Sequence, residues 1–342
     1  MDQTWGVREL VGLIEHWRLA GTPAALVRAV EVTGFGAGQY DNALVRTASG
    51  EQAGAILRGV ADTEVNAAVE RVLAEPAAAP RTLRVGINDP EAAAGGLSCG
   101  GSALLVVEPL DALPARLWEL LRSGRPVVLG TLVERDGHPK TLAFDDETTV
   151  GTLGSTDLET HVVAVGRELL ANPRANRTVL EVAPGRVLIE KVLPRTRLVT
   201  VGGGEVIDAL VDMARALGWL VEPMADGEPT VEAIRLCGPT DAVVVTTHHP
   251  QWGPAALASA LRSDAFFVGA LGSRRTQQNR AERLEALGVG PGEVARIHGP
   301  VGLDLGGRTP AETALAICAQ VLAVRSGRDL PSLTDRSRPI NA

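Results

Sequence analysis

The chain has 342 residues, of which 45% are hydrophobic and 22% are charged, and its formal net charge is −8. This length predicts two domains, because a single core stops growing near about 250–300 residues, and the composition excludes a chain that is disordered throughout. The negative charge argues against sequence-independent binding of nucleic acid, which needs a broad basic face, but it still allows a local basic pocket.

The first part of the chain mixes predicted helices with predicted hairpins. Apolar residues recur at helical spacing over 7–17, and further helices are predicted at 62–73, 113–123 and 157–170. Strands are predicted at 24–32, 42–47, 52–57, 82–87, 102–110, 126–134 and 140–144, with two more within 179–190. Turn signals at 48–51 and 136–137 pair some of these strands into hairpins. The pattern predicts an α+β domain over residues 1–193.

After Pro194 and Arg195, which make a plausible linker, strands and helices alternate. Strands are predicted at 197–201, 219–224, 241–246 and 265–271, and helices at 205–217, 254–261, 273–287 and 310–325. Short apolar strands that alternate with helices predict a parallel, doubly wound sheet. The fold class is therefore α/β, with a Rossmann-like domain over residues 194–342.

The three cysteines, Cys99, Cys237 and Cys318, are scattered without a Cys-x-x-Cys pair. This spacing predicts neither a disulfide framework nor a zinc site, and it fits a reducing cytoplasm. The N-terminus lacks a basic segment followed by an apolar one, so no signal peptide is expected. No apolar run approaches the about 20 residues that span a bilayer, so no membrane insertion is expected.

The first candidate site is the glycine turn at Gly202 and Gly204, which follows a predicted strand and opens a helix. Gly202 can make a tight turn, and Gly204 lets the backbone approach a phosphate that the helix N-terminus attracts. The third fingerprint position holds Ile207 instead of Gly or Ala, so close packing of helix on sheet is expected to be compromised. Asp226, after the next strand, is a late candidate for contact with a ribose. The alternative interpretation is a turn that only reverses the chain.

The second candidate site follows the apolar strand at 265–271 and consists of Gly272, Ser273, Arg274 and Arg275. Ser273 can cap the helix and leave backbone N–H groups that point outward. Two arginines in a first turn are unfavourable beside the positive helix end, and a bound anion would relieve that conflict. The alternative interpretation is a pair of solvated surface arginines.

A third glycine-rich loop, residues 301–308, carries Asp304 and Arg308. It precedes Thr309, Pro310 and Glu312, which are expected to form a capping box at the start of the last helix. Loops at the carboxyl ends of parallel strands meet at one crevice, so the three glycine-rich segments are expected to face it.

Two histidines, His248 and His249, end another predicted strand and could reach the same crevice. Adjacent residues point in different directions, so the two do not make a metal pair. The pattern leaves open whether one of them contacts a ligand or both are ordinary loop residues.

Cys99 lies in a glycine-rich segment of the N-terminal domain, directly before Gly100 and Gly101. A cysteine among glycines has little packing role and is a candidate for an accessible thiol. Cys237 and Cys318 are instead expected to be small core residues.

Several of these segments together resemble the XdhC/CoxI family. In the C-terminal domain the resemblance rests on residues 267–275 (FVGALGSRR), 296–306 (RIHGPVGLDLG) and 309–312 (TPAE). In the N-terminal domain it rests on residues 97–101 (LSCGG) and 107–110 (VEPL). Residues 202–206 correspond to the family's first βα turn, and Thr247 and His248 to its strand-end histidine segment.

This resemblance implies a molybdenum cofactor-binding accessory protein that matures the cofactor and delivers it to an apo molybdenum hydroxylase, of xanthine dehydrogenase or CO dehydrogenase type. Such a protein is a cofactor chaperone more than an enzyme. The resemblance also implies that the chain forms a homodimer and that a cysteine desulfurase is a further partner. The cofactor would be molybdopterin or its dinucleotide form. A thiolate suits molybdenum as a soft ligand, so Cys99 is the candidate metal ligand. The candidate cofactor-binding residues are Cys99, Gly100, Gly101, Gly202, Gly204, His248, Gly272, Ser273, Arg274, Arg275 and Asp304.

Three positions depart from the family pattern. The family usually has a second cysteine in a Ser-Gly-Gly-Cys stretch, and here residues 57–60 read Leu-Arg-Gly-Val, so Val60 takes its place. Glu205 stands where a histidine is common, and of the usual pair of acids only Asp226 is left. Two other functions therefore stay open: an NAD(P)-dependent oxidoreductase, and a non-catalytic maturation scaffold with a vestigial Rossmann site.

Overall fold

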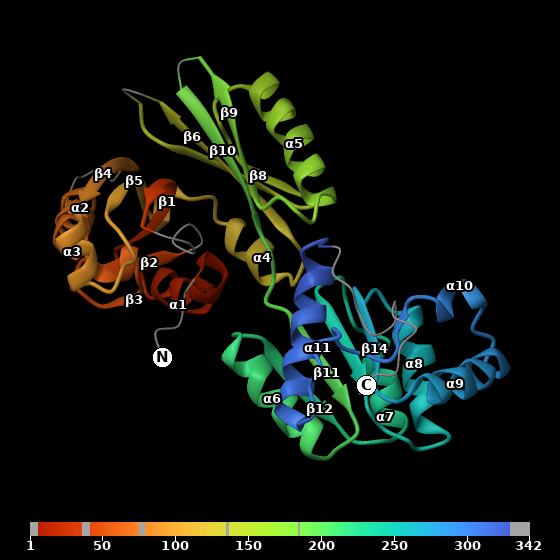
Figure 1. Ribbon diagram of the computed structural model, residues 1–342. Coiled ribbons are helices and arrows are strands. Elements are labelled where there is room, and N and C mark those ends of the chain that lie inside the picture. The colour runs from red at the N-terminus through yellow and green to blue at the C-terminus, as the bar shows by residue number, and fades with distance from the viewer. Residues whose placement is uncertain (1–5, 36–41, 75–78, 135–136, 184, 329–342) are drawn as a thin grey trace. The chain divides into compact units, whose positions relative to one another are not determined.

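The protein is represented by a computed structural model that describes residues 6–35, 42–74, 79–134, 137–183 and 185–328 (Figure 1). The chain divides into two compact units, Met1–Pro194 and Arg195–Ala342. In the described residues no helix is both long and apolar enough to cross a membrane.

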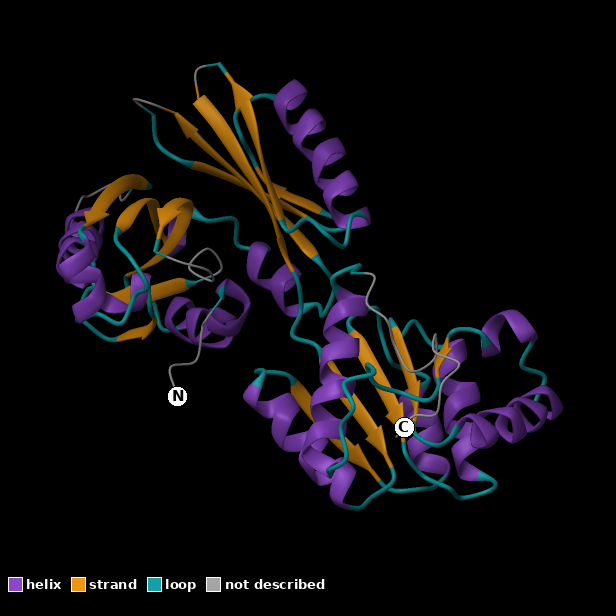
Figure 2. Cartoon of the chain, in the orientation of Figure 1, coloured by secondary structure: helices purple, strands orange, loops and turns teal. Residues whose placement is uncertain are grey.

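The N-terminal unit contains two antiparallel five-stranded sheets (Figure 2). The first has the order β3-β2-β1-β5-β4, with β1 (Ala24–Gly34), β2 (Ala43–Thr47), β3 (Gln52–Gly54), β4 (Arg81–Ile87) and β5 (Gly101–Pro109). The second has the order β8-β7-β6-β10-β9, with β6 (Val127–Glu134), β7 (Lys140–Phe144), β8 (Thr149–Gly151), β9 (Arg177–Val182) and β10 (Gly185–Val192).

Helices of this unit cover both sheets because each has one apolar face. They are α1 (Val7–Leu19), α2 (Asp62–Ala74), α3 (Asp89–Ala94), α4 (Leu117–Arg122) and α5 (Thr156–Ala171). On α2 the buried residues recur at helical spacing, as at Val65, Val69 and Val72, and they share a core with β1 and β5. Residues of α1 and α4 share a second core with both sheets, and α5 packs on the second sheet.

A buried charged cluster joins the two sheets of the N-terminal unit. Arg28 on β1 donates to Glu108 on β5 at 2.9 Å and to Glu190 on β10 at 2.9 Å. The Thr141 hydroxyl on β7 donates to the other Glu108 oxygen at 2.6 Å. Each buried charge therefore has an opposite charge, and the cluster takes members from both sheets.

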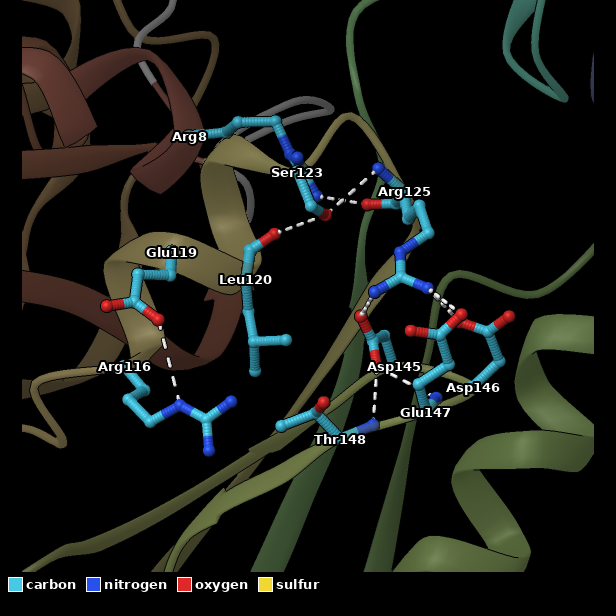
Figure 3. Close-up of polar contacts among 10 residues, drawn as sticks. All are labelled: Arg8, Arg116, Glu119, Leu120, Ser123, Arg125, Asp145, Asp146, Glu147 and Thr148. Carbon is cyan, nitrogen blue, oxygen red and sulfur yellow. Dashed lines mark hydrogen bonds and ion pairs between the residues drawn. The ribbon is translucent and has the colours of Figure 1, made fainter.

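The segment after α4 is also fixed by charged side chains (Figure 3). Arg8 donates to the backbone carbonyls of Leu121, Arg125 and Val192. Arg125 in turn forms ion pairs with Asp145 at 2.7 Å, Asp146 at 3.2 Å and Glu147 at 2.8 Å. These contacts tie α1 to the end of α4 and to the last residue of β10.

The C-terminal unit is a parallel sheet of order β12-β11-β13-β14-β15 with helices around it, which confirms the predicted doubly wound Rossmann-like domain (Figure 1). Its strands are β11 (Arg197–Val201), β12 (Leu220–Met224), β13 (Asp241–Val245), β14 (Phe267–Ala270) and β15 (Ile297–His298). Its helices are α6 (Glu205–Ala216), α7 (Glu228–Ile234), α8 (Trp252–Arg262), α9 (Arg274–Ala286), α10 (Pro291–Val294) and α11 (Pro310–Arg325).

Some boundaries differ from the predictions for local reasons. The strand predicted at 52–57 ends at Gly54, because Leu57 and Arg58 have left-handed φ values of 49° and 54° and begin a short 3-10 turn, η1 (Leu57–Gly59). The helix predicted from residue 113 begins at Leu117, after a second 3-10 turn, η2 (Leu110–Ala112). The short elements α3, α7, α10 and β15 were not predicted, since periodicity needs longer segments to show.

Candidate functional site

The strand order of the Rossmann domain reverses between β11 and β13, and ligands of such sheets bind outside this switch point. Gly202 follows β11 there with a φ of 116°, and a Cβ on it would lie 2.7 Å from the Thr246 hydroxyl and 3.0 Å from the Thr247 nitrogen. Gly202 therefore lets the ends of β11 and β13 approach each other, which is a structural role.

The helix that follows this turn, α6, begins at a position with open space around it. Gly204 is the N-cap residue, with a φ of 102° and no heavy atom within 4 Å of a Cβ built on it. The first turn already carries two acids, Glu205 and Asp208, which offset the positive helix end. Such a terminus attracts an additional anion weakly. Ile207 is buried, so α6 accommodates the bulky residue at this position.

Asp226 has a partner of its own at the same end of the sheet. Its carboxylate accepts a hydrogen bond of 2.8 Å from the Thr247 hydroxyl. A contact between Asp226 and a ribose would have to share or break this bond, so the arrangement does not favour a nicotinamide dinucleotide.

A pocket of about 260 Å³ lies beside the switch point, between the segments that follow β13 and β14. Pockets that enclose a whole small ligand usually have a volume of about 300–1,000 Å³. This pocket is smaller, so it suits one part of a larger molecule. Its lining residues are Thr247, His248, His249, Gly253, Pro254, Ser273, Arg275, Thr276, Asn279, Arg280 and Arg283.

The N-terminal ends of two helices, α8 and α9, border this pocket. Neither helix has an acid in its first turn, so nothing there offsets the two positive helix ends. Ser273 caps α9 as predicted, accepting from the Thr276 nitrogen. His249 serves α8 in a similar way, because its Nδ1 accepts from the backbone nitrogens of Gln251 and Trp252 at 3.3 Å.

The pocket lining is basic in a chain whose net charge is −8. The lining residues include Arg275, Arg280 and Arg283 and no Asp or Glu. Two helix N-termini and three arginines together form a site suited to an anion, and phosphate is one of the anions that such sites bind.

Part of the predicted site is therefore gathered at this pocket, namely His248, Ser273 and Arg275. The adjacent Gly272 has a φ of 128°, a conformation that favours glycine, at the turn from β14 to α9. Gly202, Gly204, Arg274 and Asp304 are not lining residues.

A side chain of α11 forms a hydrogen bond with the third glycine-rich loop. The Gly302 nitrogen donates to the Gln320 side chain at 2.7 Å, and the Gln320 amide contacts His298 at 3.3 Å. The capping box predicted at the start of α11 is confirmed, since Thr309 and Glu312 exchange the expected hydrogen bonds.

Sequence reasoning missed several pocket residues on α9, in particular Asn279, Arg280 and Arg283. A signal was present, because Arg275, Asn279 and Arg283 are spaced i, i+4 and i+8 and so share one helix face. What the spacing does not show is that this face lies against the start of α8.

Cys99 lies in the N-terminal unit, in the exposed loop between α3 and β5. The loop is fixed at Gly100, whose nitrogen donates to Asp89 at 2.7 Å and whose carbonyl accepts from the Phe35 nitrogen at 3.2 Å. A Cβ on Gly101 would meet the Thr33 carbonyl, so this glycine permits close pairing of β5 with β1. In the part of the chain that the structure describes, no three His, Cys, Asp or Glu side chains group as a metal site.

The turn at Leu57, Arg58 and Gly59 lies beside the Cys99 loop. Val60 packs against Gly95, and a Cβ on Gly96 would lie 3.9 Å from the Arg58 guanidinium. The other two cysteines are core residues as expected, and burial raises the pKa of Cys237 to about 11 and that of Cys318 to about 12.

Comparison with known proteins agrees with the geometry of the C-terminal unit. Residues 198–321 match the family of the XdhC Rossmann domain. The C-terminal unit is an XdhC Rossmann domain. The resemblance to the XdhC/CoxI family that the sequence predicted is thereby confirmed.

Similar curated proteins come from two bacteria. The chain is 26% identical to the molybdenum cofactor insertion chaperone PaoD of Escherichia coli over 309 residues, which are 90% of this chain and 85% of PaoD. It is 29% identical over 154 residues to the uncharacterized protein YqeB of Escherichia coli, and 27% identical over 158 residues to a probable xanthine dehydrogenase subunit of Bacillus subtilis. Those two alignments span 28% and 46% of the respective relatives.

A solved structure described as a xanthine dehydrogenase from Bacillus halodurans is similar in structure, and the match covers 97% of this chain and 98% of the chain in that structure. The TM-score is 0.63 and the sequence identity is 21%. This match shows that the two proteins share their fold.

Proposed function

We propose that this protein matures a molybdenum hydroxylase by binding the molybdenum cofactor and delivering it to the apo-enzyme. The observation that carries the proposal is the acid-free pocket between α8 and α9, since the molybdenum cofactor has a phosphate or diphosphate group in either of its forms. The similarity to PaoD along 90% of the chain supports the same assignment.

The residues at the pocket fit the phosphate-bearing end of this cofactor. The Arg275 guanidinium can donate charge-assisted hydrogen bonds, and the first turn of α9 offers outward-pointing backbone N–H groups. His248, which is exposed at the rim, is a further donor. When bound, the cofactor supplies the molybdenum centre that the client enzyme uses.

Cys99 is the proposed soft ligand toward molybdenum. Its loop is exposed, so a bound group could reach the thiol, whereas Cys237 and Cys318 are buried with raised thiol pKa values. Since Val60 replaces the second family cysteine, any thiol chemistry at this end of the sheet rests on one cysteine. A cysteine desulfurase and a second copy of the chain are further proposed partners.

The first experiment measures molybdenum and pterin in protein purified anaerobically from a host that makes the cofactor. We expect near-stoichiometric pterin in the wild type and a clear loss in Arg275→Ala, because one charge-assisted contact contributes about 1.5–3 kcal/mol. The matched control is Arg274→Ala, which removes the same charge from the neighbouring position outside the pocket lining.

Cys99→Ser in the same assay should lower molybdenum content and leave pterin content unchanged, because serine is a poorer ligand for a soft metal. A wild type that folds normally yet holds no pterin, even when offered free cofactor, would contradict the proposal and favour a maturation scaffold. Saturable NAD(P) binding in that protein would instead favour an oxidoreductase.

A further inference from the structure

Two arginines are buried in the part of the chain that the structure describes, and they differ in their partners. Arg28 is 3% exposed and Arg280 is 8% exposed. Arg28 has two carboxylates within 3 Å, those of Glu108 and Glu190. Arg280 donates only to neutral acceptors, the side-chain oxygen of Gln277 and, at 3.0 Å, the carbonyl of Leu271.

The surroundings of Arg280 add to this imbalance of charge. It lines the pocket with Arg275 and Arg283 and with the first turns of α8 and α9, and the lining residues include no Asp or Glu. Burial lowers the pKa of Arg280, with no carboxylate to offset the effect. The pKa of Arg28, by contrast, is raised, since Glu108 and Glu190 outweigh the effect of burial.

Arg8 is another part-buried arginine, and its surroundings include negative groups: burial lowers its pKa, and the Glu9 carboxylate partly offsets this effect. Its guanidinium donates to three carbonyls, of which Leu121 lies at the C-terminal end of α4, where the helix dipole is negative. Among the residues that the structure describes, no carboxylate offsets the effect of burial on Arg280. An arginine contributes five N–H donors, and the two hydrogen bonds of Arg280 leave others for a ligand.

We propose that Arg280 is a ligand-binding residue and that its counter-ion is a phosphoryl group with two negative charges, held between α8 and α9. The inference rests on the proposed function, which places a phosphate-bearing cofactor at this pocket. It adds a selectivity: a dianionic phosphate monoester or a diphosphate balances the pocket charges, and a singly charged phosphodiester does so incompletely.

The test is titration calorimetry of the full chain, purified free of cofactor, with three probes: inorganic phosphate, pyrophosphate and dimethyl phosphate. We expect the wild type to bind the first two at least about tenfold more tightly than monoanionic dimethyl phosphate, a difference of one charge-assisted contact.

In Arg280→Gln this preference should collapse, with phosphate affinity reduced by about tenfold or more. The melting temperature of the unliganded variant should equal or exceed that of the wild type, because a buried charge without a counter-ion has been removed. Arg262→Gln is the matched control: it makes the same change of net charge on α8 outside the pocket lining, and it should leave all three affinities unchanged.

Phosphate affinity that is unchanged in a folded Arg280→Gln variant would overturn the inference and make Arg280 a structural residue. If the wild type holds pterin but binds no phosphate or pyrophosphate, the inference falls and the proposed function stands. If phosphate binding depends on Arg280 but the protein never holds pterin, the anion site stands and the proposed function falls.

Discussion

The two arginines that are buried in the described residues, one in each unit, have opposite surroundings. In the N-terminal unit, Arg28 lies between Glu108 and Glu190, so the cluster is neutralised by the protein itself. In the Rossmann domain, Arg280 lies among other positive groups, and its charge is balanced by nothing that the structure describes. Removing one partner of a buried ion pair is destabilising, because it leaves the other charge buried without a counter-charge. A buried charge beside a pocket that has no such partner in the protein can instead be balanced by a bound ligand. Burial alone does not tell the two apart, because both side chains are buried.

The largest effect on stability should come from breaking the balanced cluster. Glu108→Gln leaves Arg28 buried with one carboxylate fewer, and the free energy of unfolding should fall by about 3–5 kcal/mol, as for other buried pairs that lose one partner. Denaturant unfolding measures this. The control is Glu119→Gln, which breaks the exposed pair with Arg116 seen in Figure 3 and should change stability by less than about 1 kcal/mol. Equal effects of the two changes would show that the buried cluster contributes no more to the stability of the N-terminal unit than an exposed ion pair does.

A smaller effect is expected at the glycine turn after β11. Gly202→Ala adds a Cβ close to the Thr246 hydroxyl at a φ of 116°, so the free energy of unfolding should fall by about 1–3 kcal/mol. Gly203→Ala is the matched control one residue away, where a Cβ meets nothing within 4 Å and stability should change by about 0.5 kcal/mol or less. Similar melting temperatures for both variants would show that Gly202 is not needed to bring β11 and β13 together.

The smallest effect concerns a satisfied charge at the surface, in the capping box of α11. Hydrogen bonds from the backbone nitrogens of Arg308 and Thr309 lower the pKa of Glu312. A carboxyl whose pKa is lower in the folded state stabilises the fold above its unfolded pKa and loses that effect as the pH falls through the folded value. Glu312→Gln should therefore be less stable than the wild type at pH 7, and the two should converge below about pH 4. Thermal melts across this range measure it, and a gap that persists at low pH would refute the linkage.

Most of the fold could be predicted from the sequence because its long elements carry strong periodicity. The strands of the Rossmann domain are short apolar runs between helices, and Thr309 with Glu312 marks the start of α11 in the residues themselves. The site was predictable only in part. Ser273 and Arg275 stand out locally, as a capping residue and an arginine at the positive end of a helix. Arg280 does not, because its meaning depends on how α9 packs beside α8 and on the absence of a nearby carboxylate among the described residues, and both are properties of the folded chain.

The Arg28 cluster has a consequence for how this architecture can vary in evolution. Its charges come from strands of two different sheets, so replacing the first sheet would leave Glu190 without its arginine, and replacing the second would leave Arg28 with Glu108 alone. The two sheets are therefore expected to be inherited together, as one block. The short segment from Val192 to Arg197 contains no member of the cluster. Recombination within this segment would therefore leave all the charges of the cluster together. A charged contact buried between two sheets in this way makes them a single heritable module.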